Sequence, residues 1–404
     1  MKPNTPHFLT LGAALLLAPL SSTLAQSTWQ TTDALTPYRG RAIVADAAGN
    51  FISLAIDDST SSTGPVSTAV NLSTNTGLAW QTVGLIPGYA LKLTAASDGT
   101  LYASGNRTPT VSGKAFVWFS QDHGTNWTVS DPWTGQTQTN ALISMDLAAA
   151  PSGAVYLCGY IFAGGKWVVR KGQPTSSSLV WSTVDTFAGT QPNSIAIRPG
   201  PAGQPDYIVV CGQSSSSWTV RRSADGGATW ATIEAHGPGT AYSVAADMNG
   251  DLYVDGAITT NIITATNVTT TIVHHQQVVT TNYTTTSESG WLVQKSTNDG
   301  AGWTSVDFAL NARPAYARSL MVDALGRVLA VGTLTTTPNT WIVRGSADGG
   351  ATWVTTDTFL PAGYSWSQAF GAASDASGNI CVVGDVENGT PSADLAPIRR
   401  LAAQ

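Results

Sequence analysis

The chain has 404 residues, a formal net charge of −6 and only 11% charged residues. This balance excludes a basic stripe for nucleic acid and a polybasic patch for a membrane surface. After the first 25 residues, no stretch approaches the ~20 apolar residues that a transmembrane helix needs.

The first 25 residues predict a secretory signal peptide. Lys2 precedes an apolar run from Leu9 to Leu20, and the segment ends with small residues at Thr23 and Ala25. We therefore expect cleavage after Ala25, export to the periplasm or beyond the cell, and a mature chain over residues 26–404 that forms a single domain.

A ladder of tryptophans indicates an internal repeat. Most of the intervals between them are close to 50 residues, and one interval is longer because of an insertion. The ladder consists of Trp29, Trp80, Trp127, Trp181, Trp230, Trp303 and Trp353.

Each repeat contains four short runs that are typical of β-strands, bounded by Gly, Asn, Asp and Pro. Repeated four-stranded units predict the blades of a β-propeller. The segment "STWQTTDAL" near the start closely resembles "ATWVTTDTFL" of the last full repeat, while the chain stops after "APIRRL". We therefore expect an all-β, seven-bladed propeller of antiparallel blades, in which strand 28–34 completes the last blade and removes its open edges.

Acidic residues recur four positions after most of the ladder tryptophans, and we interpret them as a structural column. Its members are Asp33, Asp131, Asp185, Glu234, Asp307 and Asp357. Glu234 therefore belongs to the scaffold in this interpretation.

The octapeptide "SADGGATW" occurs at residues 223–230 and again at 346–353. Its Ser and Asp side chains can accept turn N–H groups, and its Gly can adopt a backbone conformation that other residues avoid. Asn75 and Asn298 replace the Asp in two looser copies. Because an amide can take over a hydrogen bond but not proton transfer, we assign this Asp to the scaffold.

These octapeptides match the Asp-box, or BNR, motif, so the chain resembles the sialidase-like Asp-box β-propellers. The resemblance covers nearly all of residues 26–404 and implies the fold more strongly than an activity, since the family includes glycosidases, lyases, sorting receptors and assembly factors. Its sialidases bind a substrate carboxylate through three arginines and use a Tyr activated by Glu, with Asp as acid/base. The sialidase Arg-Ile-Pro signature is absent here, where Arg39-Gly40-Arg41 stands instead.

The insertion at residues 257–290 alternates β-branched and polar residues and predicts a long β-hairpin from the fifth blade, on the side of the candidate site. Such a hairpin suits shielding of a ligand, contact with a partner, or no binding role at all. His274 and His275 are neighbours in a strand and point to opposite faces, so we do not expect them to share a metal ion.

The candidate site lies on the face of the ring where the loops enter the inner strands. We expect a cluster there of arginines with aromatic and acidic residues from contiguous blades. The predicted ligand-binding residues are Arg39, Arg41, Arg107, Arg313, Arg318 and Trp366, and the candidate catalytic residues are Glu387, Asp385 and Tyr364.

Several functions remain open from the sequence. Recognition of an anionic glycan or a cell-envelope partner needs only Arg forks and aromatic faces. A sialidase-like exo-glycosidase would use the Tyr, Glu and Asp. An assembly scaffold would use the same face, and arginines that are only solvated or cap carbonyls would bind nothing.

No cofactor, metal site or nucleic-acid partner is expected, and we expect a monomer. Cys158, Cys211 and Cys381 lie in apolar runs and are predicted to be buried free thiols.

Overall fold

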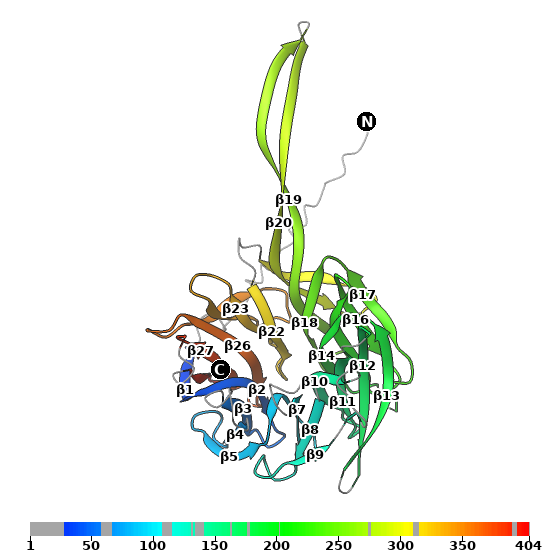
Figure 1. The fold of residues 1–404 in the computed structure, drawn as a ribbon, viewed down its shortest axis with the longest axis vertical. Coiled ribbons are helices and arrows are strands. Elements are labelled where there is room, and N and C mark those ends of the chain that lie inside the picture. The colour runs from blue at the N-terminus through cyan, green and yellow to red at the C-terminus, as the bar shows by residue number, and fades with distance from the viewer. Residues whose placement is uncertain are drawn as a thin grey trace, which may run out of the picture.

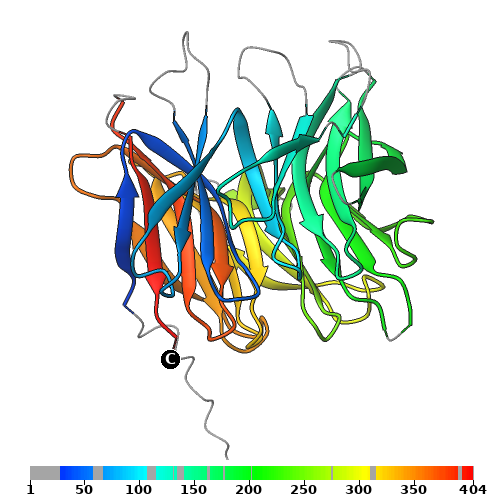
Figure 2. The same ribbon diagram turned by 90° about the horizontal axis from the view of Figure 1, so that it is seen from below.

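The computed structural model describes residues 28–57, 67–106, 115–130, 132–133, 141–161, 164–175, 178–201, 203–273, 276–309, 315–389 and 394–403. These residues form seven four-stranded antiparallel sheets arranged around a central axis. Figure 1 looks along this axis, and Figure 2 shows the strands running from one face of the ring to the other. The predicted all-β, seven-bladed propeller is confirmed.

The strands follow one another from the axis outwards in each blade. Blades 1 and 2 contain β2 (Tyr38–Ala45), β3 (Phe51–Asp57), β4 (Thr68–Ser73), β5 (Gln81–Ile86), then β6 (Tyr89–Ala95), β7 (Leu101–Asn106), β8 (Ala115–Ser120), β9 (Thr128–Ser130). Blades 3 and 4 contain β10 (Leu142–Ala149), β11 (Val155–Ile161), β12 (Lys166–Pro174), β13 (Leu179–Ala188), then β14 (Gln191–Arg198), β15 (Tyr207–Ser214), β16 (Ser217–Ser223), β17 (Ala231–His236).

Blades 5 and 6 contain β18 (Gly239–Ala246), β19 (Leu252–Val273), β20 (Gln276–Ser296), β21 (Thr304–Ala309), then β22 (Ala315–Val322), β23 (Val328–Leu334), β24 (Thr340–Ser346), β25 (Val354–Phe359). Blade 7 contains β26 (Trp366–Ser374), β27 (Ile380–Glu387), β28 (Ala396–Leu401) and β1 (Gln30–Leu35).

Strand β1 closes the ring from the other end of the sequence. It pairs with β28 in antiparallel register, from Gln30 opposite Arg400 to Leu35 opposite Ala396. The N-terminal segment thus supplies the outer strand of the last blade, as predicted, and covers the edge that β28 would otherwise present to solvent.

Tryptophans of the third strands fill the spaces between blades. Trp341 in blade 6 is fully buried, and a Cβ on Gly384 in blade 7 would come within 2.5 Å of its ring. Trp218 stands in the same relation to Gly256 of the next blade, at 2.8 Å. Glycine is therefore required on the neighbouring second strand, because a Cβ would collide with the indole and, still more closely, with a backbone carbonyl oxygen of the inner strand. The equivalent residues of four blades, Trp167, Trp218, Trp291 and Trp341, are all buried.

The acidic column forms ion pairs between blades. Arg344 of β24 donates to both oxygens of Asp307 on the preceding blade, at 2.5 and 2.6 Å. The same bidentate geometry joins Arg221 to Asp185 between blades 3 and 4, and Arg399 to Asp357 between blades 6 and 7. These acids hold neighbouring sheets together, as the structural interpretation requires.

The octapeptide closes the turn between the third and fourth strands. In the first exact copy, Ser223 Oγ accepts the Gly227 N–H at 2.8 Å and donates to Asp225, which accepts the Thr229 N–H at 2.8 Å. The Thr229 hydroxyl, the Thr229 N–H and the Ser223 hydroxyl all donate to this carboxylate and lower the pKa of Asp225 to about 2. Asn75 accepts the equivalent Ala79 N–H at 2.9 Å. The scaffold role of the Asp is therefore confirmed.

Removal of the serine hydroxyl from this turn is expected to be more damaging than removal of the acid's charge. Ser223→Ala leaves the buried Gly227 N–H without its acceptor and should lower the free energy of unfolding by about 1–3 kcal/mol. Asp225→Asn should lower the urea midpoint at pH 7 by less than Ser223→Ala does, since Asn75 already makes the equivalent serine and main-chain bonds and the bond from the Thr229 hydroxyl is the one that is lost. A larger loss in Asp225→Asn than in Ser223→Ala, measured by urea unfolding, would contradict this scaffold role.

The predicted hairpin exists, but it leads away from the expected side. Strands β19 and β20 pair continuously from Leu252 opposite Ser296 to Val273 opposite Gln276. Figure 1 shows them running outwards from the rim in the plane of the ring, so they do not cover the end of the channel. The expected position beside the candidate site is therefore wrong, because the paired strands bend sideways after leaving blade 5.

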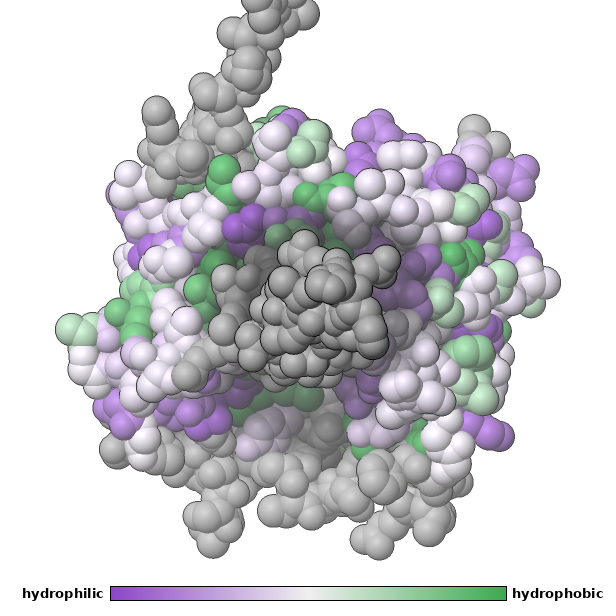
Figure 3. All heavy atoms as spheres, turned by 90° about the horizontal axis from the view of Figure 1, so that it is seen from above, coloured by the Kyte–Doolittle hydropathy of each residue, from purple (hydrophilic) through white to green (hydrophobic). Residues whose placement is uncertain are grey.

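The rim around the hairpin carries scattered rather than continuous apolar residues in Figure 3. Within the described ranges, no helix is long and apolar enough to cross a membrane.

Candidate functional site

A β-bulge interrupts every inner strand at the same position of the repeat. In each blade, the pairing between the first and second strands shifts by one residue, as between Gly40 and Ala42 in β2. An extra residue in a bulge has its side chain re-aimed out of the regular alternation. The bulge residues, in blade order, are Arg41, Leu91, Met145, Asn193, Tyr242, Arg318 and Phe370.

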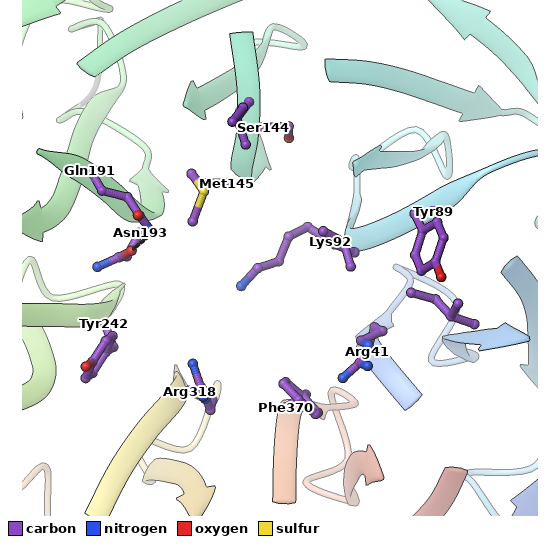
Figure 4. A pocket seen from close by; sticks show the side chains of 13 residues that line it. Arg41, Tyr89, Lys92, Ser144, Met145, Gln191, Asn193, Tyr242, Arg318 and Phe370 are labelled. Carbon is purple, nitrogen blue, oxygen red and sulfur yellow. Dashed lines mark hydrogen bonds between the residues drawn. The ribbon is translucent and has the colours of Figure 1, made fainter. Parts of the chain in front are cut away.

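All seven bulge residues line one pocket of about 440 Å³ on the axis of the ring, which we call the mouth pocket. Figure 4 labels all of them except Leu91 and shows the labelled side chains around a common space. Their neighbours Ile56, Tyr89, Lys92, Ile143, Ser144 and Gln191 complete the lining. No Asp or Glu lies among these described lining residues, so the mouth pocket gathers cationic, amide, aromatic and aliphatic groups.

Lys92 reaches into the middle of the mouth pocket. It follows the bulge of β6, and Figure 4 shows its ammonium group extending across the ring towards the opposite blades. Among the residues that the structure describes, none forms a hydrogen bond or ion pair with the Lys92 ammonium. A bound anion would supply the partner that this group otherwise finds only in water.

Two acids, Asp255 and Asp146, lie near Lys92. Asp255 is fully buried, neither of its carboxyl oxygens forms a hydrogen bond, and burial raises its pKa well above the usual range. Burial therefore favours the uncharged form of Asp255, although the nearby charge of Lys92 lowers its pKa. Asp146 accepts hydrogen bonds from Ser194 Oγ and from the backbone N–H groups of Leu147 and Ile195. Neither acid forms a described hydrogen bond or ion pair with the Lys92 ammonium.

Beside the mouth pocket, a cluster of charges joins blade 1 to blade 7. Arg41 forms an ion pair with Asp385 at 3.0 Å and lies over the ring of Phe370, 4.4 Å from its centroid. Arg39 forms ion pairs with Glu387 at 3.2 Å and with Asp394 at 3.0 Å. Both arginines therefore pair with acids of blade 7, but Arg41 alone of the two lines the mouth pocket.

Asp385 is almost inaccessible to solvent. Only 1% of the residue is exposed, and its Oδ1 atom has no hydrogen-bond partner. Burial raises the pKa of Asp385 to about 7 and outweighs the lowering effect of Arg41; the Glu387 charge raises the pKa further. The carboxyl group therefore exchanges its proton close to neutral pH.

This raised pKa predicts a specific pH dependence of stability. The folded state binds the Asp385 proton more tightly than the unfolded chain does, whose carboxyl pKa is about 3.9. The contribution of Asp385 is therefore fully favourable below pH ~4, falls as the pH rises to about 7, and is constant above that. Asp385→Asn should remove this slope, so the stability difference between variant and wild type should change by a few kcal/mol between pH 4 and 7. Parallel stability curves from urea unfolding would contradict the raised pKa.

The structure brings together only some of the predicted site residues. Arg41 and Arg318 line the mouth pocket, from inner strands rather than from loops as predicted, and the Arg318 guanidinium also donates to the Gln368 side-chain oxygen. Arg107 and Arg313 lie outside the described residues.

Trp366, Tyr364 and Glu387 are absent from the described lining of the mouth pocket. Trp366 lies opposite Glu387 in the sheet of blade 7, and its indole N–H donates to the Asn339 side-chain oxygen at 2.6 Å. Tyr364 lies in the turn that enters β26, three residues after Pro361, whose carbonyl oxygen accepts the Tyr364 N–H. The predicted catalytic group is thus placed beside the pocket, not in it.

Of the residues that line the mouth pocket, the sequence-based site includes only Arg41 and Arg318. Lys92, Leu91, Met145 and Phe370 are among those that it omits. The sequence feature that could have found them is their position in the repeat. When the seven inner strands are aligned, Leu91, Met145 and Phe370 occupy the same position as Arg41 and Arg318, and Lys92 occupies the next one. Sorting by residue type selects Arg and Tyr in loops and overlooks a column whose members differ chemically.

No group of three or more His, Cys, Asp or Glu side chains suited to a metal ion occurs within the described ranges. The three cysteines are free and buried, as predicted, and burial raises the pKa of the Cys381 thiol to about 12. These thiols are therefore packing residues.

No protein-family model matches the chain, and no curated protein matches it. Solved structures are similar in fold. YCF48 bound to a D1 peptide is 9% identical, with a TM-score of 0.53, over 93% of this chain and 97% of that one. A GH74 xyloglucanase from Xanthomonas campestris is 14% identical, with a TM-score of 0.55, over 91% of this chain and 55% of that one.

A fungal alcohol oxidase of the AA5 family, in complex with copper, is 11% identical, with a TM-score of 0.55, over 93% of this chain and 76% of that one. At such identities the similarity shows the fold alone. The chain is a seven-bladed β-propeller whose inner strands direct seven bulge residues into one pocket.

Proposed function

We propose that this protein is a recognition propeller that binds an anionic ligand in the mouth pocket. The observation that supports this function is the ring of seven bulge residues around the ammonium group of Lys92. A cation without a protein partner, in a pocket whose described lining has no carboxylate, favours an anion electrostatically. A pocket of about 440 Å³ is in the usual range for small-molecule sites.

We further place the protein among the exported Asp-box propellers and propose that its ligand is part of a glycan or a cell-envelope partner. Support comes from the octapeptide turns, the apolar segment at residues 9–20 and the fold shared with YCF48 bound to a D1 peptide and with a xyloglucanase. A monomer that closes its own ring through β1 suits such a receptor.

A second candidate function is glycoside hydrolysis, and the observation that favours it is the pKa of Asp385. A carboxyl with a pKa of about 7 is suited to general acid catalysis. However, Asp385 is 1% exposed and forms an ion pair with Arg41, while Glu387 pairs with Arg39. A buried acid outside the described lining of the mouth pocket is poorly placed to protonate a leaving group, so binding is the better-supported function.

The test combines binding and turnover on the same acidic and neutral glycans. Sialyllactose and an oligogalacturonate should bind in calorimetric titrations, neutral xyloglucan oligosaccharides should bind more weakly, and none should be cleaved. Cleavage that is lost in Asp385→Asn or Glu387→Gln would overturn the receptor in favour of the hydrolase. Equal affinity for neutral and acidic ligands would overturn the proposed anion recognition.

A further inference from the structure

The lining of the mouth pocket has two chemically different sides. Leu91, Ile143 and Met145, from blades 2 and 3, form an aliphatic arc that remains partly exposed. Arg318, Phe370 and Arg41, from blades 6, 7 and 1, form the opposite arc. Figure 4 shows Met145 on one side of the space, Arg318 and Phe370 on the other, and Lys92 between them.

The polar groups of this lining favour one kind of anion over another. A sugar acid presents several hydroxyl groups, which need acceptors as well as donors. The described lining contains no carboxylate, and the Asn193 and Gln191 side chains already bond to each other at 2.9 Å. Asn193 also donates to the Ala241 carbonyl oxygen at 2.7 Å. The acceptors that remain are a few hydroxyl and amide oxygens, among them the buried Ser144 Oγ, so the many hydroxyl groups of a sugar acid would find fewer partners here than in water.

The aliphatic arc, by contrast, favours binding of an apolar group that covers it. Partly exposed Leu, Ile and Met side chains release water when an alkyl or aryl group packs against them, and Met adapts to differently shaped partners. Each buried methylene group raises affinity by about fourfold. An apolar tail therefore complements the aliphatic arc, whereas the hydroxyl groups of a sugar do not.

We propose that the ligand group that enters the mouth pocket is a monocarboxylate with a short apolar tail. Its carboxylate faces the Lys92 ammonium, and its tail lies against Leu91, Ile143 and Met145. This inference rests on the proposed anion recognition and narrows it to the class of acyl or aryl carboxylates, which favours a cell-envelope partner over a glycan among the two proposed ligands.

The test uses the full mature chain and four probes: acetate, hexanoate, glucuronate and the uncharged hexanol. Affinities are measured by titration at constant ionic strength. Hexanoate should bind at least tenfold more tightly than acetate, than glucuronate and than hexanol. In Leu91→Asn, the ratio of the acetate to the hexanoate Kd should fall towards one. The control is Lys166→Met, which removes an exposed lysine from β12. The Kd values of this variant for acetate and hexanoate should stay as in the wild type.

The outcomes separate this inference from the proposed function. Glucuronate binding as tightly as hexanoate, or acetate binding equally well, would overturn the apolar tail while leaving anion recognition intact. Hexanol binding as tightly as hexanoate would overturn the role of the carboxylate. Binding of none of the anions would overturn both.

Discussion

The Lys92→Met variant should bind carboxylate ligands ten- to hundredfold more weakly than the wild type. A charge-assisted hydrogen bond contributes about 1.5–3 kcal/mol, and the Lys92 ammonium has no other described partner to compete for it. Methionine keeps most of the side-chain volume and leaves the cross-strand neighbour of residue 92, Ser104, undisturbed. Stability should therefore stay close to wild type while affinity falls, as measured by calorimetric titration and urea unfolding.

The matched control is again Lys166→Met, which removes the same charge from an exposed position outside the mouth pocket. Its affinity should remain within twofold of wild type. Equal weakening in both variants would mean that the net charge of the protein, rather than the position of Lys92, determines binding.

Trp341→Ala is expected to cause the largest loss of stability among simple substitutions in the core. The Trp341 side chain is completely buried between blades 6 and 7, where it packs in one cluster with Leu329, Val382 and Trp29. Its indole N–H forms no hydrogen bond, so the side chain stabilises the fold by packing alone. Truncation of a buried Trp lowers the free energy of unfolding by about 3–5 kcal/mol.

Leu325→Ala provides the comparison, because the Leu325 side chain is 61% exposed. This substitution should lower the free energy of unfolding by less than about 0.5 kcal/mol. Chemical denaturation of both variants gives the two values. A loss below 1 kcal/mol for Trp341→Ala would mean that blade 7 does not depend on packing against blade 6.

The fold follows closely from the sequence because the repeated residues are structural. The ladder tryptophans, the octapeptide turns and the acidic column each recur for a local physical reason, and the strand at residues 28–34 matches the gap left by "APIRRL". The path of the hairpin does not follow, since alternation of side chains predicts strand pairing but not the direction in which a ribbon bends.

The candidate site is only half predicted by residue type. Arg41 and Arg318 are found because their chemistry is conspicuous, whereas Leu91 and Met145 resemble core residues in any single strand. Their common direction depends on a bulge, which adds one residue to the pairing and leaves no residue-type signature. The buried state of Asp385 also escapes the sequence, because its partner Arg41 is 344 positions away.

The central claim, that the ligand occupies the ring of bulge residues, is tested most directly by NMR of methyl-labelled methionine. Met145 lines the mouth pocket, Met321 lines the opposite end of the channel, and Met248 is 80% exposed. Titration with hexanoate or glucuronate should shift the Met145 signal and leave those of Met321 and Met248 in place. Binding that shifts Met321 or Met248 but not Met145 would contradict the claim.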